Sequence, residues 1–422
     1  MSIYTVLVLG ADGFIGRHIA FSLRKTGWRV LAHARRTARL SRMGFDTLQV
    51  DLSRPEASDP EFWHPKLTDV THVINAAGVL NAPSSVHETV HVSAPAAIYS
   101  ALPEDTKSVF VSTVGIDGSQ TDFATYRLQG EELAKQNSVT VLRVGLVLAD
   151  TSYGGSSLAR SLAALPFCLP VVGDGAQRFN PIHASDLAAV LGDVLIAENM
   201  RQNLEIGGTE TISHTELQKA YRNWLGLSAV PVLRMPIWLV KCIGKLGDAS
   251  RLGPISYTAV RQLQAGVLAQ TSPEINTARV RPVSSFLNDR PAGTQDLWHA
   301  RLYLMRPILR LVLAFLWLAS GLIGLTLPAS AFLPLVEASL PDSVLIAMAR
   351  LGGICDLLIC IALLRNWRPR FMSAVQAGLV LVYTIAFTIL APILWLLPLG
   401  GLLKNIPILA LIAVAAILED ER

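Results

Sequence analysis

Residues 5–16 read TVLVLGADGFIG, a strand-length apolar run followed by three glycines in the spacing GxxGxxG. Glycine lets the backbone approach a pyrophosphate closely, and the first turn of the helix that follows offers N–H groups and a positive dipole end. Glycine-rich turns also occur for purely steric reasons, but this one stands in the strand-turn-helix context that a dinucleotide site requires. The residues expected to contact the cofactor here are Gly10, Asp12, Gly13, Phe14, Ile15 and Gly16.

The first half of the chain alternates between short β-branched runs and helix-length amphipathic stretches, the pattern of parallel sheets built from βαβ units. This rhythm predicts an α/β fold with a doubly wound parallel sheet of Rossmann type. Residues from about 150 to 300 carry shorter helices and more turn residues, which indicates a smaller substrate lobe at the carboxyl ends of the strands. The six strand-like runs are IYTVLVL, WRVLAHA, FDTLQV, DVTHVINAA, SVFVS and SVTVLRVGLVL.

The chain becomes strongly apolar after His299, and the excess behind the overall 51% of hydrophobic residues sits mostly in this part. A membrane-spanning helix needs about 17 to 25 mostly apolar residues. We count four such stretches, at 311–327, 343–364, 371–390 and about 393–418, the last interrupted by Lys404. The predicted domains are an NAD(P)-binding domain at 1–300, with its core at 1–150 and its lobe at 150–300, and an all-α transmembrane four-helix domain at 301–422.

Arginines gather on one side of the apolar stretches. Three precede the first stretch and three fill the loop between the second and third, whereas the loop between the first and second carries Glu337 and Asp342 and no Lys or Arg. Because positively charged loops tend to stay in the cytoplasm, we expect a multi-pass protein of the inner membrane with its N-terminal domain and its EDER tail in the cytoplasm. The six arginines are Arg301, Arg306, Arg310, Arg365, Arg368 and Arg370.

The composition argues against several classes of partner. The four cysteines have no metal-ligand spacing and are too sparse for a disulfide framework, so we expect no metal site and a reducing compartment. The net charge of +4 comes without a basic run interleaved with aromatics, which argues against nucleic acid. The partners that we expect are the membrane and a small hydrophobic or lipid-like substrate, and the sequence does not indicate an oligomeric state.

The end of the second strand-like run distinguishes between the two nicotinamide cofactors. NAD sites place an Asp or Glu there for the ribose 2′-hydroxyl, but this chain has Arg35 and Arg36, which suit a 2′-phosphate. We therefore favour NADP(H), with NAD(H) as the alternative if the two arginines only solvate a loop. The adenine and the central part of the cofactor would pass two further segments, formed by Asp51, Leu52, Asn75, Ala76, Ala77 and Gly78.

Five motifs stand in order along the first 300 residues: GADGFIG, the pair Asp51-Leu52, NAAG, VST at 111–113 and LRVGLVL at 142–148. With them, this part resembles the extended and atypical short-chain dehydrogenase/reductase superfamily. It is also similar to proteins related to the accessory NADPH-binding subunit of respiratory complex I. The ending LLKNIPILALIAVAAILED resembles the DoxX-like four-helix family. The first resemblance implies a substrate-orienting Ser or Thr, a proton-exchanging Tyr, and a Lys four residues later that lowers the Tyr pKa and holds the nicotinamide ribose.

Residues 121–132, TDFATYRLQGEE, should carry this Tyr and Lys, but they match the pattern in neither of two alignments. If Tyr126 is the proton donor, its fourth neighbour is Gly130, which has no charge. If the Lys position falls on Arg127, the following LxxE matches the superfamily, and the Tyr position falls on Phe123. We prefer the second alignment because it accounts for more residues. In both alignments the catalytic pair is broken.

The altered pair limits the expected chemistry. Phe123 has no proton to exchange, and Arg127 could hold a ribose but could not relay a proton, because guanidinium pKa values lie above about 12. Thr113 fits the substrate-orienting position. Tyr126 is the candidate acid, since residues i+3 and i+4 lie on the same helix side as residue i; the alternative is that Tyr126 packs or lies at the surface.

Two further sets of polar residues lie outside this pair. In the lobe, GDGAQRFNPIHASDLA resembles the stretch where the superfamily places a substrate-facing arginine, which makes Arg178 and His183 substrate-binding candidates and Asp186 their neighbour or a helix cap. In the second apolar stretch, Arg350 and Asp356 are six residues apart. That spacing separates them by about 240° around a helix, so we expect each to pair with other groups.

Two functions agree with these features. The first is a membrane-anchored, NADPH-dependent oxidoreductase acting on a hydrophobic carbonyl substrate, in which Thr113 and Tyr126 polarise and protonate the substrate and Arg127 holds the cofactor. The second is a non-catalytic nucleotide-binding module that reports redox state to the membrane domain or steadies an assembly.

Overall fold

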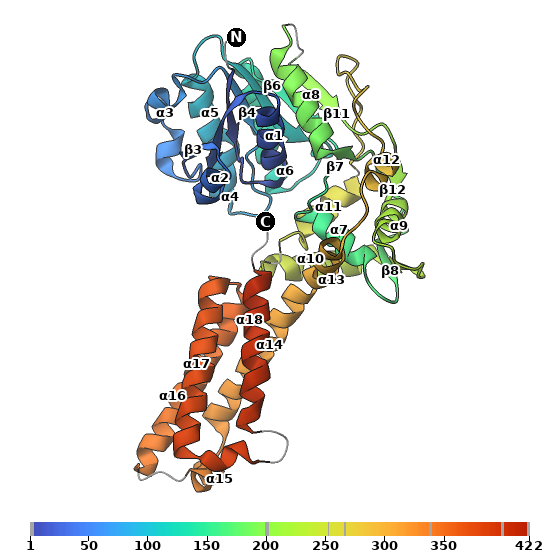
Figure 1. The fold of residues 1–422 in the computed structure, drawn as a ribbon. Coiled ribbons are helices and arrows are strands. Elements are labelled where there is room, and N and C mark those ends of the chain that lie inside the picture. Colours follow the sequence, from blue (N-terminus) through green and yellow to red (C-terminus); the bar gives the residue numbers. More distant parts are fainter. Residues whose placement is uncertain are drawn as a thin grey trace. The chain divides into compact units, whose positions relative to one another are not determined.

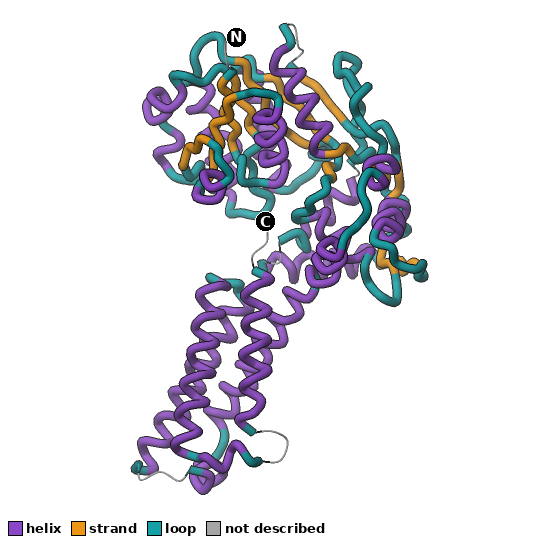
Figure 2. The backbone as a smooth tube through the Cα atoms, in the orientation of Figure 1, coloured by secondary structure: helices purple, strands orange, loops and turns teal. Residues whose placement is uncertain are grey.

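The computed structural model describes residues 4–198, 202–251, 253–265, 267–336, 340–397 and 401–419. The chain forms two compact units, which are unit 1, with residues 1–245 and 253–297, and unit 2, with residues 246–252 and 298–422. Within the described residues, all strands belong to unit 1 and the long apolar helices belong to unit 2 (Figures 1 and 2).

Unit 1 is built on a seven-stranded parallel sheet. Its strands are β1 Thr5–Leu9, β2 Arg29–Ala34, β3 Asp46–Gln49, β4 His72–Asn75, β5 Lys107–Thr113, β6 Thr140–Val144 and β11 Asn203–Ile206. Their order is β11-β6-β5-β4-β1-β2-β3, so the direction of winding reverses between β1 and β4, the switch point where ligands bind in such sheets. The predicted doubly wound fold is confirmed, and β11 is an addition to the six expected strands.

Helices cover both faces of the sheet. One face carries α1 (Phe14–Lys25) and α8 (Ala184–Ile196), and the other carries α3 (Pro60–Leu67), α5 (Ala94–Ser100) and α6 (Asp122–Gln136). Short segments complete this part, namely α2 Ala38–Arg42, the 3₁₀ helix Pro55–Ser58, α4 Ser84–Glu88 and the π-helix Thr89–Ser93.

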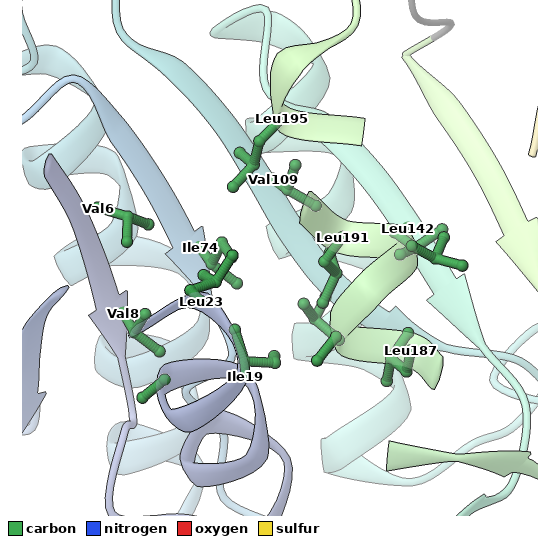
Figure 3. Close-up of a cluster of buried hydrophobic side chains, with 14 of the residues drawn as sticks. Val6, Val8, Ile19, Leu23, Ile74, Val109, Leu142, Leu187, Leu191 and Leu195 are labelled. Atoms are coloured by element: carbon green, nitrogen blue, oxygen red, sulfur yellow. The ribbon is translucent and has the colours of Figure 1, made fainter. Parts of the chain in front are cut away.

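The core follows from the alternation of side chains along each strand. Val6 and Val8 of β1 belong to the cluster with α1 and α8, whereas Leu7 and Leu9 belong to the cluster with α3 and α5. Figure 3 shows the first cluster, in which residues of β1, β4 and β5 meet the apolar sides of α1 and α8. Each fully buried aliphatic side chain stabilises the fold by about 1.5–3 kcal/mol, so these two layers hold the turn after β1 firmly in place.

The smaller lobe consists of three two-stranded sheets and short helices around their own apolar core. The strand pairs are β7 Val147–Leu148 with β10 Ile182–His183, β8 Leu169–Val172 with β13 Val232–Met235, and β9 Arg178–Phe179 with β12 Ile212–Ser213. The helices after β7 include α7 Gly155–Ala163, α9 His214–Trp224, α10 Ile237–Ala249, α11 Tyr257–Ala265, α12 Val283–Asn288 and α13 Thr294–Tyr303.

Unit 2 contains the apolar helices. Among the residues that the structure describes, three helices are long and apolar enough to cross a membrane: α14 (Met305–Thr326), α16 (Asp342–Leu364) and α17 (Pro369–Leu390). The fourth predicted stretch differs, because the helix α18 covers only Asn405–Leu418 and is preceded by two short 3₁₀ turns. Proline and glycine interrupt that stretch, and both disfavour a continuous helix. Glu337 and the last three residues of the EDER tail lie outside the described residues.

Helices α14 and α16 approach closely through glycine. A Cβ on Gly324 would lie 3.0 Å from the Cα of Gly353, the small-residue contact by which apolar helices pack in membranes. Arg350 donates to the carbonyls that end α14, at 2.7 and 2.8 Å, while Asp356 accepts hydrogen bonds from Ser320 and Tyr383 at 2.6 and 3.1 Å. Each of the two charged residues thus pairs with other groups, as their spacing predicts.

Candidate functional site

The glycines of the turn between β1 and α1 allow close contacts between backbone segments. Gly10 has a φ of +74°, and a Cβ there would lie 2.9 Å from the Cα of Ala77. A Cβ on Gly13 would lie 3.1 Å from the Gly10 carbonyl oxygen, and one on Gly16 would overlap that oxygen. No side chain caps the start of α1 at Phe14. The turn therefore offers backbone N–H groups and a positive helix end at the switch point of the sheet, which fits a pyrophosphate.

The end of β2 lies beside this turn. His33 is buried, its Nδ1 accepts a hydrogen bond from the Gly10 N–H at 3.3 Å, and burial lowers its pKa to about 4. Neutral His33 therefore supports the turn from the inside. Arg35 and Arg36 are exposed and form no hydrogen bond or ion pair with any part of the chain that the structure describes. Asp12 is also exposed, whereas Ile15 is half-buried in the first turn of α1.

Asp51 and Leu52, which follow β3, have different surroundings. The Asp51 carboxylate accepts hydrogen bonds from the N–H and the hydroxyl of Ser53, at 3.0 and 2.7 Å. Burial acts to raise the pKa of Asp51, but these hydrogen bonds and the charges of Arg35 and Arg54 outweigh it and hold the pKa below its usual value. Leu52 is buried in the apolar core. Of this pair, Asp51 alone offers polar side-chain atoms.

The loop after β4 connects the glycine turn to α6. Asn75 is buried, and its side-chain carbonyl accepts a hydrogen bond from the Ala77 N–H at 3.2 Å, which holds the loop tightly. Ala76 is half-buried and Gly78 is exposed. A Cβ on Gly78 would lie 3.3 Å from Nη1 of Arg127. The predicted NAAG segment and the residue at the predicted Lys position are therefore neighbours.

The end of β5 and the start of α6 supply the candidate catalytic residues. Thr113 ends β5, and its half-buried hydroxyl donates to the carbonyl of the next residue at 3.2 Å. Thr121 caps α6 by accepting a hydrogen bond from the N–H three residues later, at 3.3 Å. The first turns of α6 then carry Phe123, Tyr126 and Arg127. The structure thus places these three residues on one helix, next to the loop after β4.

Arg127 is buried, with 6% exposure, and its guanidinium is used inside the protein. Nη1 donates to the Ala77 carbonyl at 3.0 Å and lies 3.1 Å from Nδ1 of His91, while Nη2 donates to the Val111 carbonyl. The guanidinium also lies over the Phe110 ring, 4.3 Å from its centroid. Burial lowers the pKa of Arg127 to about 10, below the value expected from sequence, yet the group stays charged at neutral pH. Arg127 therefore ties β4 and β5 to α6.

Three rings stack beside this arginine. Tyr126 lies parallel to His87, with centroids 6.1 Å apart, and His87 lies nearly parallel to His91, at 5.6 Å. Phe123 meets His91 edge to face at 5.9 Å. Burial, with the charge of Arg127 as a second cause, lowers the pKa of His91 to about 3, so this ring is neutral. The hydroxyl of Tyr126 has no hydrogen-bond partner within the described part of the chain.

Sequence reasoning missed the two histidines of this stack, His87 and His91. His87 and His91 are four positions apart, a spacing that places side chains on the same side of a helix. The signal was available in the sequence HETVH at 87–91. His91 lies in the π-helical segment Thr89–Ser93, and such segments occur frequently at functional sites.

The two substrate-binding candidates of the lobe have separate surroundings. Arg178 is exposed on β9. His183 is buried and caps α8, and its Nδ1 lies 3.1 Å from Nη2 of Arg281, which also forms an ion pair with Asp186 at 2.8 Å. Burial lowers the pKa of His183. The cap of α8 is therefore His183 and not Asp186, and no contact joins Arg178 to His183 among the residues that can be described.

Two families match separate parts of the chain. Residues 6–138 match the NAD dependent epimerase/dehydratase family, and residues 314–413 match the DoxX-like family. The comparison with curated proteins found no match.

Several solved structures are similar to part of the chain. UDP-N-acetylglucosamine 4-epimerase from Bacillus cereus has 16% identity and a TM-score of 0.46, covering 55% of this chain and 85% of that one. UDP-glucuronic acid 4-epimerase from Bacillus cereus, in complex with NAD, has 18% identity, a TM-score of 0.46, and coverages of 55% and 87%. UDP-glucose 4-epimerase from Thermus thermophilus, in complex with NAD, has 21% identity, a TM-score of 0.43, and coverages of 55% and 86%.

The two family matches fall on the two kinds of architecture. The first lies on the parallel sheet with its glycine turn, and the second lies on the apolar helices of unit 2. The chain therefore joins an N-terminal domain of the NAD-dependent epimerase and short-chain dehydrogenase type to a C-terminal DoxX-like membrane domain.

Proposed function

We propose that unit 1 binds a nicotinamide dinucleotide and prefers NADP(H) to NAD(H). The glycine turn supports a pyrophosphate at the start of α1, and the two exposed guanidinium groups of Arg35 and Arg36 support a 2′-phosphate. Asp51 is the residue that we propose beside the adenine. When bound, the cofactor would supply a hydride donor or acceptor. NAD(H) is the alternative, since the matching family is described as NAD dependent.

Fluorescence titration of the detergent-purified full chain with NADPH and NADH tests this preference. We expect NADPH to bind more tightly, and we expect Arg35→Ala with Arg36→Ala to remove the difference by weakening NADPH alone. Arg42→Ala, an exposed arginine at the end of α2, is the matched control. Equal affinities for the two cofactors in the parent protein would contradict the proposal.

We infer that unit 1 is a membrane-anchored nucleotide-binding module that does not use Tyr-Lys proton transfer. With the dinucleotide bound, this module reports redox state to the membrane domain or steadies an assembly. The observation that carries this inference is the position of Arg127, whose terminal nitrogens contact two buried backbone carbonyls and His91. A guanidinium held in this way stays protonated at neutral pH and does not relay a proton to or from a neighbouring tyrosine. Phe123, at the predicted Tyr position, has no proton to give.

A second function is favoured by Tyr126. Tyr126 is half-buried, its hydroxyl has no hydrogen-bond partner among the described residues, and its ring is parallel to that of His87. This arrangement supports a displaced proton donor, with Thr113 orienting a hydrophobic carbonyl substrate, in an NADPH-dependent oxidoreductase. A displacement of about 1 Å from the productive geometry can cost on the order of a hundredfold in rate, so the activity would be slow.

One assay separates the two functions. NADPH oxidation is followed with the full chain in detergent against a panel of hydrophobic ketones and aldehydes, and with Tyr126→Phe as the test variant. If the chain is a nucleotide-binding module, it should bind NADPH but should not oxidise it in the presence of any of these substrates. Turnover that disappears in Tyr126→Phe, while NADPH affinity is kept, would favour the oxidoreductase.

We also propose that unit 2 lies in the inner membrane with its arginine-rich end in the cytoplasm. Glu419, which follows α18, forms ion pairs with Arg306 at 2.8 Å and Arg310 at 3.1 Å, near the start of α14. The end of α18 and the start of α14 are therefore at the same end of unit 2. This supports an even number of crossings, with α18 as a short fourth one, and a cytoplasmic position for both ends of the domain.

A further inference from the structure

The helix α10 exposes large apolar side chains. Trp238 is 66% exposed and Leu246 is 68% exposed, and Ile237 and Ile243 are exposed as well. A helix at the surface of a globular domain normally turns such residues inward, and a contiguous apolar surface marks a place where something binds. Nothing within the described parts of the chain covers these side chains.

The exposed residues form a stripe along one side of the helix. Trp238, Cys242 and Leu246 follow one another at intervals of four residues, so their side chains lie above one another. Another side of α10 is fixed by close packing: Gly244 is buried, and a Cβ there would lie 2.9 Å from the backbone nitrogen of Tyr257. The stripe cannot turn inward without breaking this contact.

Positive charges border the stripe. Lys241 and Lys245 each stand one residue before a member of the stripe, which places them along one edge of it, and the exposed Arg234 precedes the helix. Asp248 is the acidic residue of the helix, in its last turn. A helix with an apolar side that includes tryptophan, and with lysines on its polar side, is typical of helices that lie flat in the interface between lipid and water.

Helix α10 also continues into the membrane unit. From Leu246 onwards its residues belong to unit 2, where the carbonyl of Ser250 accepts a hydrogen bond from Nη1 of Arg310 at 3.4 Å. Arg310 is one of the arginines that the charge distribution predicts at the cytoplasmic surface of the membrane. With the orientation proposed above for unit 2, on which this step rests, the chain that follows α10 lies at the level of the lipid headgroups.

We propose that α10 is a lipid-binding helix in the cytoplasmic interface of the membrane. Trp238, Cys242 and Leu246 contact the acyl chains near the headgroups, and Lys241 and Lys245 contact the phosphates of anionic lipids. The occupant of the stripe is therefore the bilayer itself. This inference is independent of which cofactor unit 1 binds and of whether it catalyses a reaction.

Spin labels on α10 test the proposal with the full chain in lipid nanodiscs. The native cysteines are replaced, and single cysteines are introduced as Trp238→Cys, as Leu246→Cys, and as Lys219→Cys, the last an exposed position on α9. For each label, the collision rate with dissolved oxygen, which concentrates in lipid, is compared with that of a water-soluble nickel chelate. Variants are used only if their thermal transition matches that of the parent.

We expect the ratio of oxygen to nickel collisions to be several-fold higher at positions 238 and 246 than at position 219. The ratio at 246 should rise further when zwitterionic lipid is replaced by anionic lipid, and Lys241→Gln with Lys245→Gln should remove that rise. Equal ratios at 238 and 219 would overturn the proposal. So would spin-spin coupling between labels at 238 in nanodiscs that hold two copies, because the stripe would then be an interface between copies of the chain.

Discussion

At the scale of single residues, Arg127 stands at the position that we predict for the superfamily lysine, and its charge is used inside the protein. An ammonium is a point charge on a flexible stem, whereas a guanidinium is a planar fork whose nitrogens reach several acceptors at once. Here the fork bridges the carbonyl of Ala77, in the loop after β4, and the carbonyl of Val111, in the neighbouring strand β5. In the predicted alignment, a group suited to proton transfer is therefore replaced by one that fixes the geometry of the site.

We predict that Arg127→Met lowers the stability of unit 1. It would leave buried carbonyls without donors, and each such loss costs about 1–3 kcal/mol. The thermal unfolding of unit 1, followed by circular dichroism, should shift to lower temperature, with Arg127→Lys in between. Gln129→Met, at an exposed position of the same helix, should change the free energy of unfolding by less than about 0.5 kcal/mol. An Arg127→Met variant as stable as the parent would show that these hydrogen bonds contribute nothing.

His91 should make stability depend on pH. Burial lowers the pKa of His91 to about 3, whereas the unfolded residue titrates near 6.5. Between these two pH values the histidine is protonated in the unfolded chain and neutral in the folded one. The contribution is fully present above about pH 6.5 and is lost as the pH falls, by roughly 1.4 kcal/mol per pH unit. His91→Asn should flatten the loss measured by denaturation between pH 6.5 and 5, whereas His64→Asn, at an exposed position, should not.

At the scale of elements, the β1-turn-α1 unit was predictable because its requirements are local. The glycine spacing, the apolar strand and the helix start are contiguous in sequence. By contrast, β11 has four residues and pairs with β6, so its place depends on a partner far away in the chain. The histidine stack also joins residues of two helices, and only the spacing of His87 and His91 hinted at it. The contacts of Arg127 could not be foreseen, because they need the register of β4 against β5.

The glycine turn allows a matched pair of substitutions. Gly13→Ala brings a Cβ to 3.1 Å from the Gly10 carbonyl oxygen, which a small shift can relieve, so it should mainly weaken NADPH binding. Gly16→Ala would overlap that oxygen and should force α1 away from β1, which lowers stability as well as binding. Gly155→Ala has open space around its Cβ and should change neither property. NADPH affinity is measured by titration and stability by thermal unfolding. Equal losses of stability in Gly13→Ala and Gly16→Ala would contradict this distinction.

At the scale of the whole molecule, the number of membrane crossings depends on the short helix α18. Three helices have the length of a span, while α18, with 14 residues, measures about 21 Å against a hydrocarbon core of about 30 Å. The ion pairs of Glu419 with Arg306 and Arg310 nevertheless bring the end of α18 back to the start of α14. A short helix of this kind is accommodated by local thinning of the bilayer or by oligomerisation.

We therefore predict a cytoplasmic C-terminus. A reporter that is active only in the cytoplasm, fused after the last residue, should be active, and the same reporter inserted between α14 and α16 should be inactive. An inactive C-terminal fusion with an active loop insertion would mean that the orientation is the opposite.

Glu419→Gln should lower the thermal stability of unit 2, because it leaves two arginines with a weaker partner.

The position of β11 in the chain bears on the order in which this protein is made. The sheet of unit 1 is complete once Ile206 has been synthesised, and the first apolar helix begins only at Met305. On the order of a hundred residues lie between them, which at about 5–20 residues per second gives roughly 5 to 20 s of translation. The nucleotide-binding sheet therefore has time to fold on the ribosome before the first membrane helix is made.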